Sequence, residues 1–404
     1  MRIIVIGGGA AGLAAAIGAA GKGRQVTILE KAMKPGRKIL ASGNGRCNLM
    51  NTGAPRYFGG EKFACTVLKQ RDGMVKGLFE KWGLRLYEEE SGRVYPACSQ
   101  ASAVLDVLLA EAAGRGVTIR CGAEVKDIRP EGQGYRVYCG DGEAVYADKV
   151  ILTCGGMAGL NLGHDGTPYG LYARLGHRVI APKPALTGIE TEKAAIKGLS
   201  GLRCNAILRL CVGNEVKDAA AGEALFTDYG ISGVCAMQLS AAAGKEIHHA
   251  PVIKVDFSPM MGIAEREYTH YLPPFEKADA HKEEAEKLIR ARMERLPRER
   301  LLTGLLPALL AKKVADVRPE KLAGMLTAYP LPVTGIRGFE HAQVTQGGLD
   351  TAQFDTETME SRLRAGLYAA GEVLNVDGDC GGFNLQFAFL SGYIAGQNAA
   401  KRME

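Results

Sequence analysis

The sequence predicts an α/β protein in which a dinucleotide-binding domain is interrupted by an insert. Three observations lead to this prediction. The N-terminus alternates apolar runs with an Ala-rich helical pattern, the middle changes to antiparallel-strand patterning and charged segments broken by prolines, and the first style returns near the C-terminus. A chain of 404 residues also exceeds what one hydrophobic core usually organises. We therefore expect the interrupted domain at 1–185 and 342–404 and the insert at 186–341.

A β-α-β unit opens the chain. It consists of a β-branched run, an Ala-rich helical pattern and a second apolar run, at residues 2–6, 10–20 and 25–29. The loop Gly7-x-Gly9-x-x-Gly12 lies between the first strand and the helix, which is the context that makes this fingerprint specific for a Rossmann-type domain. Such glycines permit the tight turn, the close approach to a pyrophosphate and the helix-sheet packing. Candidate cofactor contacts in the loop are Gly7, Gly9, Ala10, Ala11 and Gly12.

An acidic residue closes the second strand. Glu30 follows Gly12 by 18 residues, and its carboxylate can accept hydrogen bonds from ribose hydroxyls. Glu30 and its neighbour Lys31 are therefore added to the candidate cofactor contacts. FAD and NAD share this fingerprint, so the choice between them depends on other segments.

Three later segments favour non-covalently bound FAD. The buried strand pattern at 150–154 ends in Gly155-Gly156, and the strand pattern at 366–370 ends in Gly371-Glu372, well placed for ribityl hydroxyls. The third segment opens the last helix, whose N-terminus would stabilise negative charge at the flavin N1/C2 edge. Its candidate contacts are Gly381, Gly382, Phe383 and Asn384.

Four runs of residues identify a family resemblance. They are the segments 36–48 (GRKILASGNGRCN), 223–233 (EALFTDYGISG), 358–361 (TMES) and 381–386 (GGFNLQ). With them the chain resembles the BaiN/YhiN-like flavoproteins, bacterial NAD(P)/FAD-dependent oxidoreductases with a glutathione-reductase-like FAD domain. The resemblance implies that Val125 presents backbone to the adenine. It also implies a flavin-wrapping loop with the contacts Arg37, Lys38, Ser42, Gly43, Asn44 and Asn48.

The same resemblance implies an architecture and a reaction. The insert is expected to hold a small β-barrel in a β-rich part at 186–262, a helical cap at 263–328 and a return at 329–341, which together cover the active site. The implied reaction is reduction of a conjugated carbon-carbon double bond in a hydrophobic, keto-steroid or bile-acid-like small molecule. No second strand-GxGxxG-helix unit is present, so NAD(P)H is expected to act as a transient donor, or another reductant replaces it.

The candidate catalytic residues lie where this chain departs from the family pattern. Asp228 stands where the family usually has His, beside Tyr229, a candidate proton donor like Tyr169. His164 and Asp165 follow the flavin-side glycines in an atypical loop. Two alternatives stay open: a dehydrogenase or oxidase of another small molecule, and a flavin-binding regulatory or RNA-modification-associated protein.

Composition argues against several other classes. The net charge of +6 is mild, and Lys and Arg alternate with acids at 276–321 as on a solvated helix face, so we expect no nucleic-acid partner. Ten cysteines occur singly without Cys-x-x-Cys, which argues against a disulfide relay and indicates a reducing cytoplasm. His248 and His249 are adjacent and would point to opposite faces of a strand, so no metal site is predicted. Glycines interrupt the apolar N-terminus, so we expect neither a signal peptide nor a membrane span.

Overall fold

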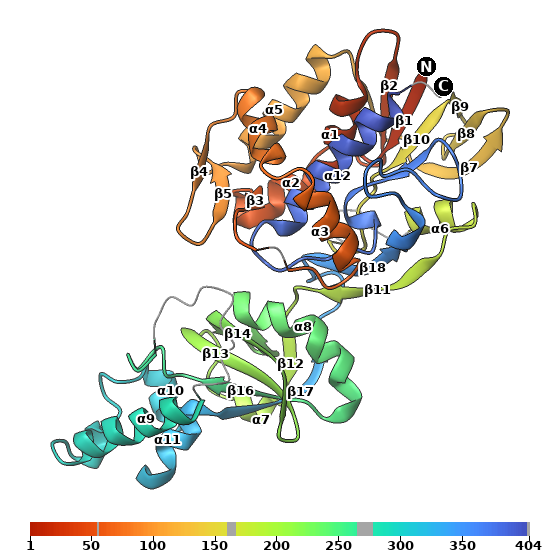
Figure 1. The fold of residues 1–404 in the computed structure, drawn as a ribbon. Helices are drawn as coiled ribbons and strands as arrows, with labels where there is room; N and C mark the ends of the chain where they lie inside the picture. Colours follow the sequence, from red (N-terminus) through yellow and green to blue (C-terminus); the bar gives the residue numbers. More distant parts are fainter. Residues whose placement is uncertain (55, 160–166, 265–277, 402–404) are drawn as a thin grey trace. The chain divides into compact units, whose positions relative to one another are not determined.

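The computed structural model describes residues 1–54, 56–159, 167–264 and 278–401, and these form two compact units. Unit 1 combines Met1–Lys183 with Val344–Glu404, and unit 2 is Pro184–Gln343 (Figure 1). Within the described ranges, no helix is both long and apolar enough to cross a membrane.

A five-stranded parallel sheet forms the centre of unit 1, in the order β19-β10-β1-β2-β6. Its strands are β1 (Arg2–Ile6), β2 (Gln25–Glu30), β6 (Thr118–Cys121), β10 (Lys149–Leu152) and β19 (Leu367–Ala369). Val5 pairs with Ile28 on one side and with Ile151 on the other. Because every neighbouring pair is parallel, the carboxyl ends of all five strands lie along one edge of the sheet.

Smaller sheets and helices surround this centre. The antiparallel strands are β3 (Met50–Asn51), β4 (Leu86–Glu88) and β5 (Arg93–Pro96) in one sheet, and β7 (Val125–Glu131), β8 (Gly134–Cys139) and β9 (Ala144–Ala147) in a meander, while β11 (Val179–Ala185) joins β18 (Val344–Leu349). The helices are α1 (Ala10–Ala19), α2 (Arg37–Ala41), α3 (Glu61–Lys69), α4 (Met74–Lys81), α5 (Ala101–Gly114), α6 (Thr167–Ala173) and α12 (Phe383–Ala399).

Glycines let α1 and α12 pack unusually closely beside the sheet (Figure 1). A Cβ atom at Gly392 would lie 2.2 Å from the Ala11 carbonyl oxygen, and one at Gly396 would lie 2.0 Å from that of Ala15. Real Cβ atoms do not approach so closely, so both positions require glycine at this spacing. The helix that carries the phosphate loop is thereby fixed against the last helix of the chain.

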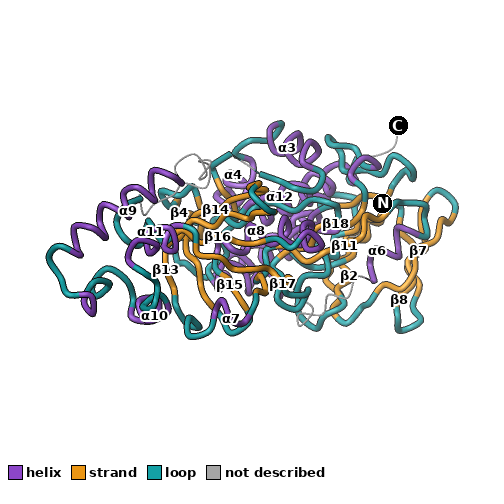
Figure 2. Tube along the Cα trace, turned by 90° about the horizontal axis from the view of Figure 1, so that it is seen from below, coloured by secondary structure: helices purple, strands orange, loops and turns teal. Residues whose placement is uncertain are grey.

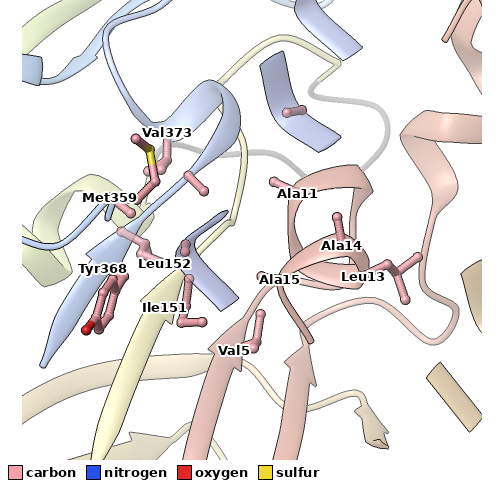
Figure 3. Packing of buried hydrophobic residues seen from close by; sticks show 14 of the residues in the cluster. Val5, Ala11, Leu13, Ala14, Ala15, Ile151, Leu152, Met359, Tyr368 and Val373 are labelled. Atoms are coloured by element: carbon pink, nitrogen blue, oxygen red, sulfur yellow. The ribbon is translucent and has the colours of Figure 1, made fainter. Parts of the chain in front are cut away.

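Apolar side chains from the sheet and from α1 form the core of unit 1. Figure 3 shows Val5, Ile151 and Leu152 on the strands and Leu13 and Ala15 on the helix, and all five are buried. Strands covered on both faces explain why the sequence of β1 and β10 is continuously apolar instead of alternating.

Unit 2 is a closed β-barrel with five helices among its described residues. The barrel order is β12-β15-β14-β13-β16-β17, and β12 pairs with β17 to close it. Figure 2 shows β13, β14, β15, β16 and β17 among the strands. The strands are β12 (Ile189–Thr191), β13 (Arg203–Val212), β14 (Glu215–Phe226), β15 (Gly230–Ser232), β16 (Val252–Asp256) and β17 (Tyr329–Ile336). The helices are α7 (Lys193–Ile196), α8 (Val234–Glu246), α9 (Ala278–Met293), α10 (Ala308–Lys313) and α11 (Pro319–Thr327).

The predicted fold class is confirmed, since the parallel sheet, the barrel and the inserted helices are all present. The segment 186–262, expected to be β-rich, holds β12 to β16 and also the 13-residue helix α8, which the sequence patterns did not indicate. Its small side chains carry a weak pattern, and burial of Ala236 and Leu239 against the barrel explains why it is helical.

Candidate functional site

The candidate cofactor residues gather at the carboxyl edge of the parallel sheet. Gly7 follows β1, Gly155 follows β10 and Gly371 follows β19, and these three strands are neighbours in the sheet. Open α/β sheets bind ligands at this edge. The chain therefore brings together three segments that lie far apart in the sequence.

The geometry of the N-terminal glycine loop fits a diphosphate. Gly7 has a φ of +103°, and a Cβ there would lie 2.7 Å from the Thr153 carbonyl oxygen. A Cβ at Gly12 would lie 1.8 Å from the Gly7 carbonyl oxygen, whereas one at Gly9 would meet nothing within 4 Å. Gly9 caps α1 without a side-chain hydrogen bond, so the first-turn amides of Ala10, Ala11 and Gly12 have no acceptor within the helix and can bind an anion.

Glu30 holds the loop and keeps acceptor capacity. Its carboxylate oxygens accept hydrogen bonds from the amides of Gly8 (2.6 Å) and Ala32 (2.7 Å). Each oxygen has a second lone pair, so ribose hydroxyls can still bind. Lys31 is exposed and pairs with Glu124 at 3.3 Å.

Three predicted cofactor residues meet around one carboxylate. The Lys38 ammonium lies 2.6 Å from Oε2 of Glu372, whose Oε1 accepts a hydrogen bond from the Thr345 amide at 2.8 Å. A Cβ at Gly156 would lie 2.4 Å from the Thr345 hydroxyl, which accepts from the amides of Met157 and Ala158. Sequence reasoning missed Thr345, because it belongs to no recognisable motif.

The segment 36–48 adopts several left-handed backbone conformations. Gly36 and Gly43 have φ values of +71° and +56°, and the non-glycine residues Asn44 and Cys47 each have a φ of +55°. Strained residues of this kind persist where the surrounding structure over-determines them, often at ligand sites. Ser42 donates its hydroxyl hydrogen to the Ile39 carbonyl at 2.6 Å. The predicted contacts Arg37 and Val125 begin α2 and β7.

Cys47 in this segment is a packing residue in the apo chain. Its side chain is fully buried, and burial raises the pKa of its thiol to about 11. Such a thiol is protonated at neutral pH, so it is a poor nucleophile or redox group.

One buried acceptor in the flavin-wrapping loop fits a bound group. The Asn48 Oδ1 atom is buried and has no hydrogen-bond partner among the described residues. A Cβ at Gly382, which caps α12 with a φ of +107°, would lie 2.7 Å from that oxygen. A buried acceptor without a partner is costly, and a donor on a bound flavin would satisfy it.

Two predicted contacts near α12 have structural partners instead. The Asn384 side-chain amide both donates to and accepts from the Gly378 backbone at 2.8 Å. Phe383 is buried and its ring lies 6.5 Å from that of Tyr57. We infer that Phe383 and Asn384 shape the loop before α12, while Gly381 and Gly382 provide close backbone approach.

Tyr169 is a further polar group at this edge. Its hydroxyl is buried without a hydrogen-bond partner in the part of the chain that is described. Burial raises the pKa of Tyr169 well above its usual value, and the charge of Glu372 adds to this effect. Tyr169 is therefore a neutral donor close to the Lys38–Glu372 pair. The nearby candidates His164 and Asp165 lie outside the described residues.

Asp228 and Tyr229 belong to unit 2 and have different surroundings. The Arg337 guanidinium lies 4.7 Å from the centre of the Tyr229 ring, and a Cβ at Gly188 would lie 2.6 Å from the Tyr229 hydroxyl. Arg337 also contacts His341 Nε2 and lies 3.9 Å from Glu190. The Tyr229 side chain thus lies in a cluster of ionisable groups.

Asp228 is exposed and lines a surface hollow of about 360 Å³. The Lys193 ammonium donates a hydrogen bond to the Asp228 backbone carbonyl oxygen. The hollow is also lined by Lys197, Ser200 and Thr227. Two adjacent residues predicted as one catalytic pair therefore face different environments.

Comparison with known proteins agrees with this geometry. The family model described as HI0933-like protein Rossmann domain matches residues 1–398. The chain is 35% identical to the 3-dehydro-bile acid delta(4,6)-reductase of Clostridium scindens over 99% of both chains. It is 28% identical to the ribosomal RNA dihydrouridine synthase of Escherichia coli, over 98% of this chain and 97% of that one.

A solved structure shares the fold. The open form of a flavocytochrome c3 fumarate reductase superposes with a TM-score of 0.51 at 18% identity, over 99% of this chain and 78% of that chain. The expectation of no nucleic-acid partner finds no support, because a relative along the whole chain is named for ribosomal RNA. From the match over residues 1–398 and the 35% identity, the chain belongs to the HI0933-like Rossmann flavoprotein family.

Proposed function

We propose that this chain is an FAD-dependent reductase of a conjugated carbon-carbon double bond in a hydrophobic, keto-steroid or bile-acid-like molecule. The observation that carries the proposal is the 35% identity with a bile acid delta(4,6)-reductase over 99% of both chains. The carboxyl edge of the sheet supports the cofactor, since its glycine conformations, its buried acceptor and its free helix amides all suit FAD.

The residues of unit 1 would bind and orient the cofactor. The amides at the start of α1 bind the diphosphate, and Glu30 accepts from the ribose hydroxyls. Asn48 would accept from an N–H group of the flavin, and the Lys38–Glu372 pair would bind its hydroxyl groups. When bound, FAD supplies hydride exchange with a carbon centre.

Reduction of a conjugated enone also requires a proton. Tyr229 is the proposed donor, because a phenol hydroxyl can donate a proton and the Arg337 guanidinium lies 4.7 Å from the ring centre. A cation at that position stabilises the phenolate left after proton transfer. Asp228 would influence substrate preference through the hollow that it lines.

Anaerobic reduction tests the electron flow. Purified protein loaded with FAD is mixed with NADH or NADPH, and a 3-keto-4-ene steroid is then added. We expect loss of the visible flavin absorbance with one nicotinamide and its return on addition of the enone. Two results together would refute the reductase. The flavin would not bleach with NADH or NADPH, and flavin reduced with dithionite would not be reoxidised by the enone. Tyr229→Phe is the matched control, because it should still bleach.

The reaction direction has its own control. A dehydrogenase or oxidase of another small molecule would release hydrogen peroxide in air when its donor is supplied. Peroxide formation with a saturated keto-steroid and no enone reduction would favour this alternative over the proposed reductase.

RNA is a second candidate substrate. Relatives from Escherichia coli and Haemophilus influenzae, 28% and 27% identical, are named ribosomal RNA dihydrouridine synthase. The uracil ring also contains a carbon-carbon double bond conjugated to a carbonyl, so both substrates demand the same flavin chemistry. The observation that favours this candidate is the distribution of positive charge in unit 2. Dihydrouridine formation in an RNA stem-loop, measured by mass spectrometry, would test it.

A further inference from the structure

The net charge of the chain is concentrated in one short segment. Residues 287–321 contain ten Lys or Arg and four Asp or Glu, an excess of six. The whole chain has 50 basic and 44 acidic residues, so the remainder holds forty of each and is balanced. The entire excess of +6 therefore lies in the part of unit 2 that runs from the second half of α9 through α11.

Most of these cations are exposed, as expected for the solvated helix face that the sequence predicted at 276–321. Lys287 forms an ion pair with Glu284, whereas seven other exposed cations form no ion pair or side-chain hydrogen bond within the described ranges. The seven are Arg290, Arg295, Arg298, Arg300, Lys312, Arg318 and Lys321, which we call the cationic surface.

Packing holds the cationic surface in place. The Arg292 guanidinium donates to the carbonyl oxygens of Leu301 (2.8 Å) and Thr303 (2.7 Å), which ties the end of α9 to the following segment. The Lys313 ammonium donates to the carbonyl oxygens of Ala194 (2.8 Å) and Lys197 (3.2 Å). Helices α9, α10 and α11 are grouped together in Figure 1.

The bonds of Lys313 connect the cationic surface to the hollow of about 360 Å³ beside Asp228. Lys193 and Lys197 line this hollow and are exposed, and Ser200 adds a hydroxyl donor. Glu192 and Asp228 are the exposed acids at this place. With Lys313, three lysines face these two acids, so a small positive excess continues from the cationic surface to the hollow.

The composition of the surface selects its partner. Six of the ten basic residues at 287–321 are arginines, whose planar donors match phosphate oxygens. No Phe, Tyr or Trp occurs between 278 and 328, so the surface has no platform on which unpaired bases could stack. The apolar face of α9 is covered, with Ala285 and Ile289 buried. In the described parts of α9 to α11, Met293 and Leu309 are the exposed large apolar side chains, too few to form a broad face that inserts into a membrane.

We propose that the cationic surface binds the phosphate backbone of base-paired RNA. The choice of RNA over DNA rests on the second candidate function above, whereas the surface itself follows from charge and packing. Contacts to backbone phosphates fix the position of a duplex without reading its bases. RNA bound there would be held on the same unit that carries Asp228 and Tyr229.

Fluorescence anisotropy with the FAD-loaded full chain and a labelled RNA stem-loop tests this proposal. The test variant combines Arg295→Gln, Arg298→Gln and Arg300→Gln, and the control combines the exposed residues Lys22→Gln, Lys62→Gln and Lys81→Gln of unit 1. Both lose three charges. At about 0.1 M salt we expect the test variant to bind at least about 10-fold more weakly and its slope of log K against log salt to fall by about 2.

Three outcomes would overturn the proposal: no binding of RNA by the unmodified chain, equal losses in both variants, or tighter binding to phosphatidylserine vesicles than to RNA. Binding to a DNA duplex of the same length is measured as well. Equal affinity for DNA and RNA would overturn the choice of RNA. Enone reduction is measured on the same proteins. RNA binding without enone reduction would contradict the steroid proposal alone, and enone reduction without RNA binding would contradict only the cationic surface.

Discussion

The two units place their polar groups in opposite ways. In unit 1 the candidate ligand edge is built largely from backbone, with Gly7 at a φ of +103° and Gly371 at +74°. In unit 2 the polar groups are side chains: a fully buried cluster inside, and an excess of cations outside. Backbone geometry suits a cofactor that is the same in every turnover. Side chains suit the recognition of a substrate, because they can differ between related proteins that act on different substrates.

The buried cluster of unit 2 differs from the Lys38–Glu372 pair at the sheet edge of unit 1, whose two side chains are only partly buried. Arg209 Nη2 lies 2.8 Å from Asp256 Oδ2, and His281 Nδ1 lies 3.0 Å from the same oxygen. The Ser258 hydroxyl lies 3.1 Å from His281 Nδ1. These residues join two barrel strands to α9, so hydrogen bonds as well as apolar contacts hold the barrel and this helix together.

Removal of the central carboxylate should have the largest effect on stability. Asp256→Ala leaves the Arg209 charge buried without its ion-pair partner, and we expect unfolding to become easier by about 3–5 kcal/mol. Hydrogen exchange of peptides covering β13 and β16 measures the loss in unit 2 directly.

The matched control is Glu223→Gln, which removes an equally short but exposed pair with Arg203 at 2.7 Å. Exposed pairs contribute under about 1 kcal/mol. If both variants change exchange by the same amount, burial of charge does not distinguish this cluster.

The proposed proton donor gives the next largest effect. Tyr229→Phe removes the hydroxyl and keeps the ring against Arg337, so we expect turnover with the enone to fall by about 100-fold. The rate of flavin reduction by the nicotinamide should stay unchanged in rapid-mixing measurements. Equal losses in both half-reactions would contradict a role in proton transfer and indicate a structural one.

The sequence indicated the glycine conformations of the candidate cofactor edge in unit 1 more readily than the side-chain contacts of either unit. The motif Gly7-x-Gly9-x-x-Gly12 and the pair Gly371-Glu372 are local, and each glycine reports one backbone requirement. By contrast, the Thr345 amide donates to Glu372 only because the fold brings the two residues together, and Thr345 belongs to no motif. No pattern indicates such a contact before the chain is folded.

The insert was harder to predict for the same reason. Arg209, Asp256 and His281 are separated by 47 and 25 residues along the chain, so no local window contains the cluster. Helix α8 was missed because packing against the barrel, and not periodicity, determines its conformation. The cations at 287–321 were visible in the sequence, but it could not show that seven of them form no ion pair with another described residue.

Two glycines of the phosphate loop offer a test with a smaller effect. Gly12→Ala places a methyl group on the Gly7 carbonyl, and we expect a loss of about 1–3 kcal/mol in the absence of FAD. Gly9→Ala meets nothing within 4 Å and has an ordinary φ of −85°, so the apo protein should keep its stability. Titration with FAD should nevertheless show weaker binding of Gly9→Ala. Unchanged FAD affinity would move the diphosphate away from Gly9.

The smallest expected effect concerns a buried histidine of unit 1. His177 Nε2 lies 2.7 Å from the Ser361 hydroxyl and Nδ1 lies 3.2 Å from the Tyr172 carbonyl, so both partners are uncharged, unlike the carboxylate that contacts His281. Burial lowers the pKa of His177 below its usual value of 6.5. The unfolded chain therefore takes up a proton at a higher pH than the folded chain, and stability falls as the pH drops below about 6.5. Urea unfolding of the unmodified chain and of His177→Gln between pH 5 and 7 measures this: the variant should be less stable at pH 7 but show a flatter dependence, and parallel curves would contradict the assignment.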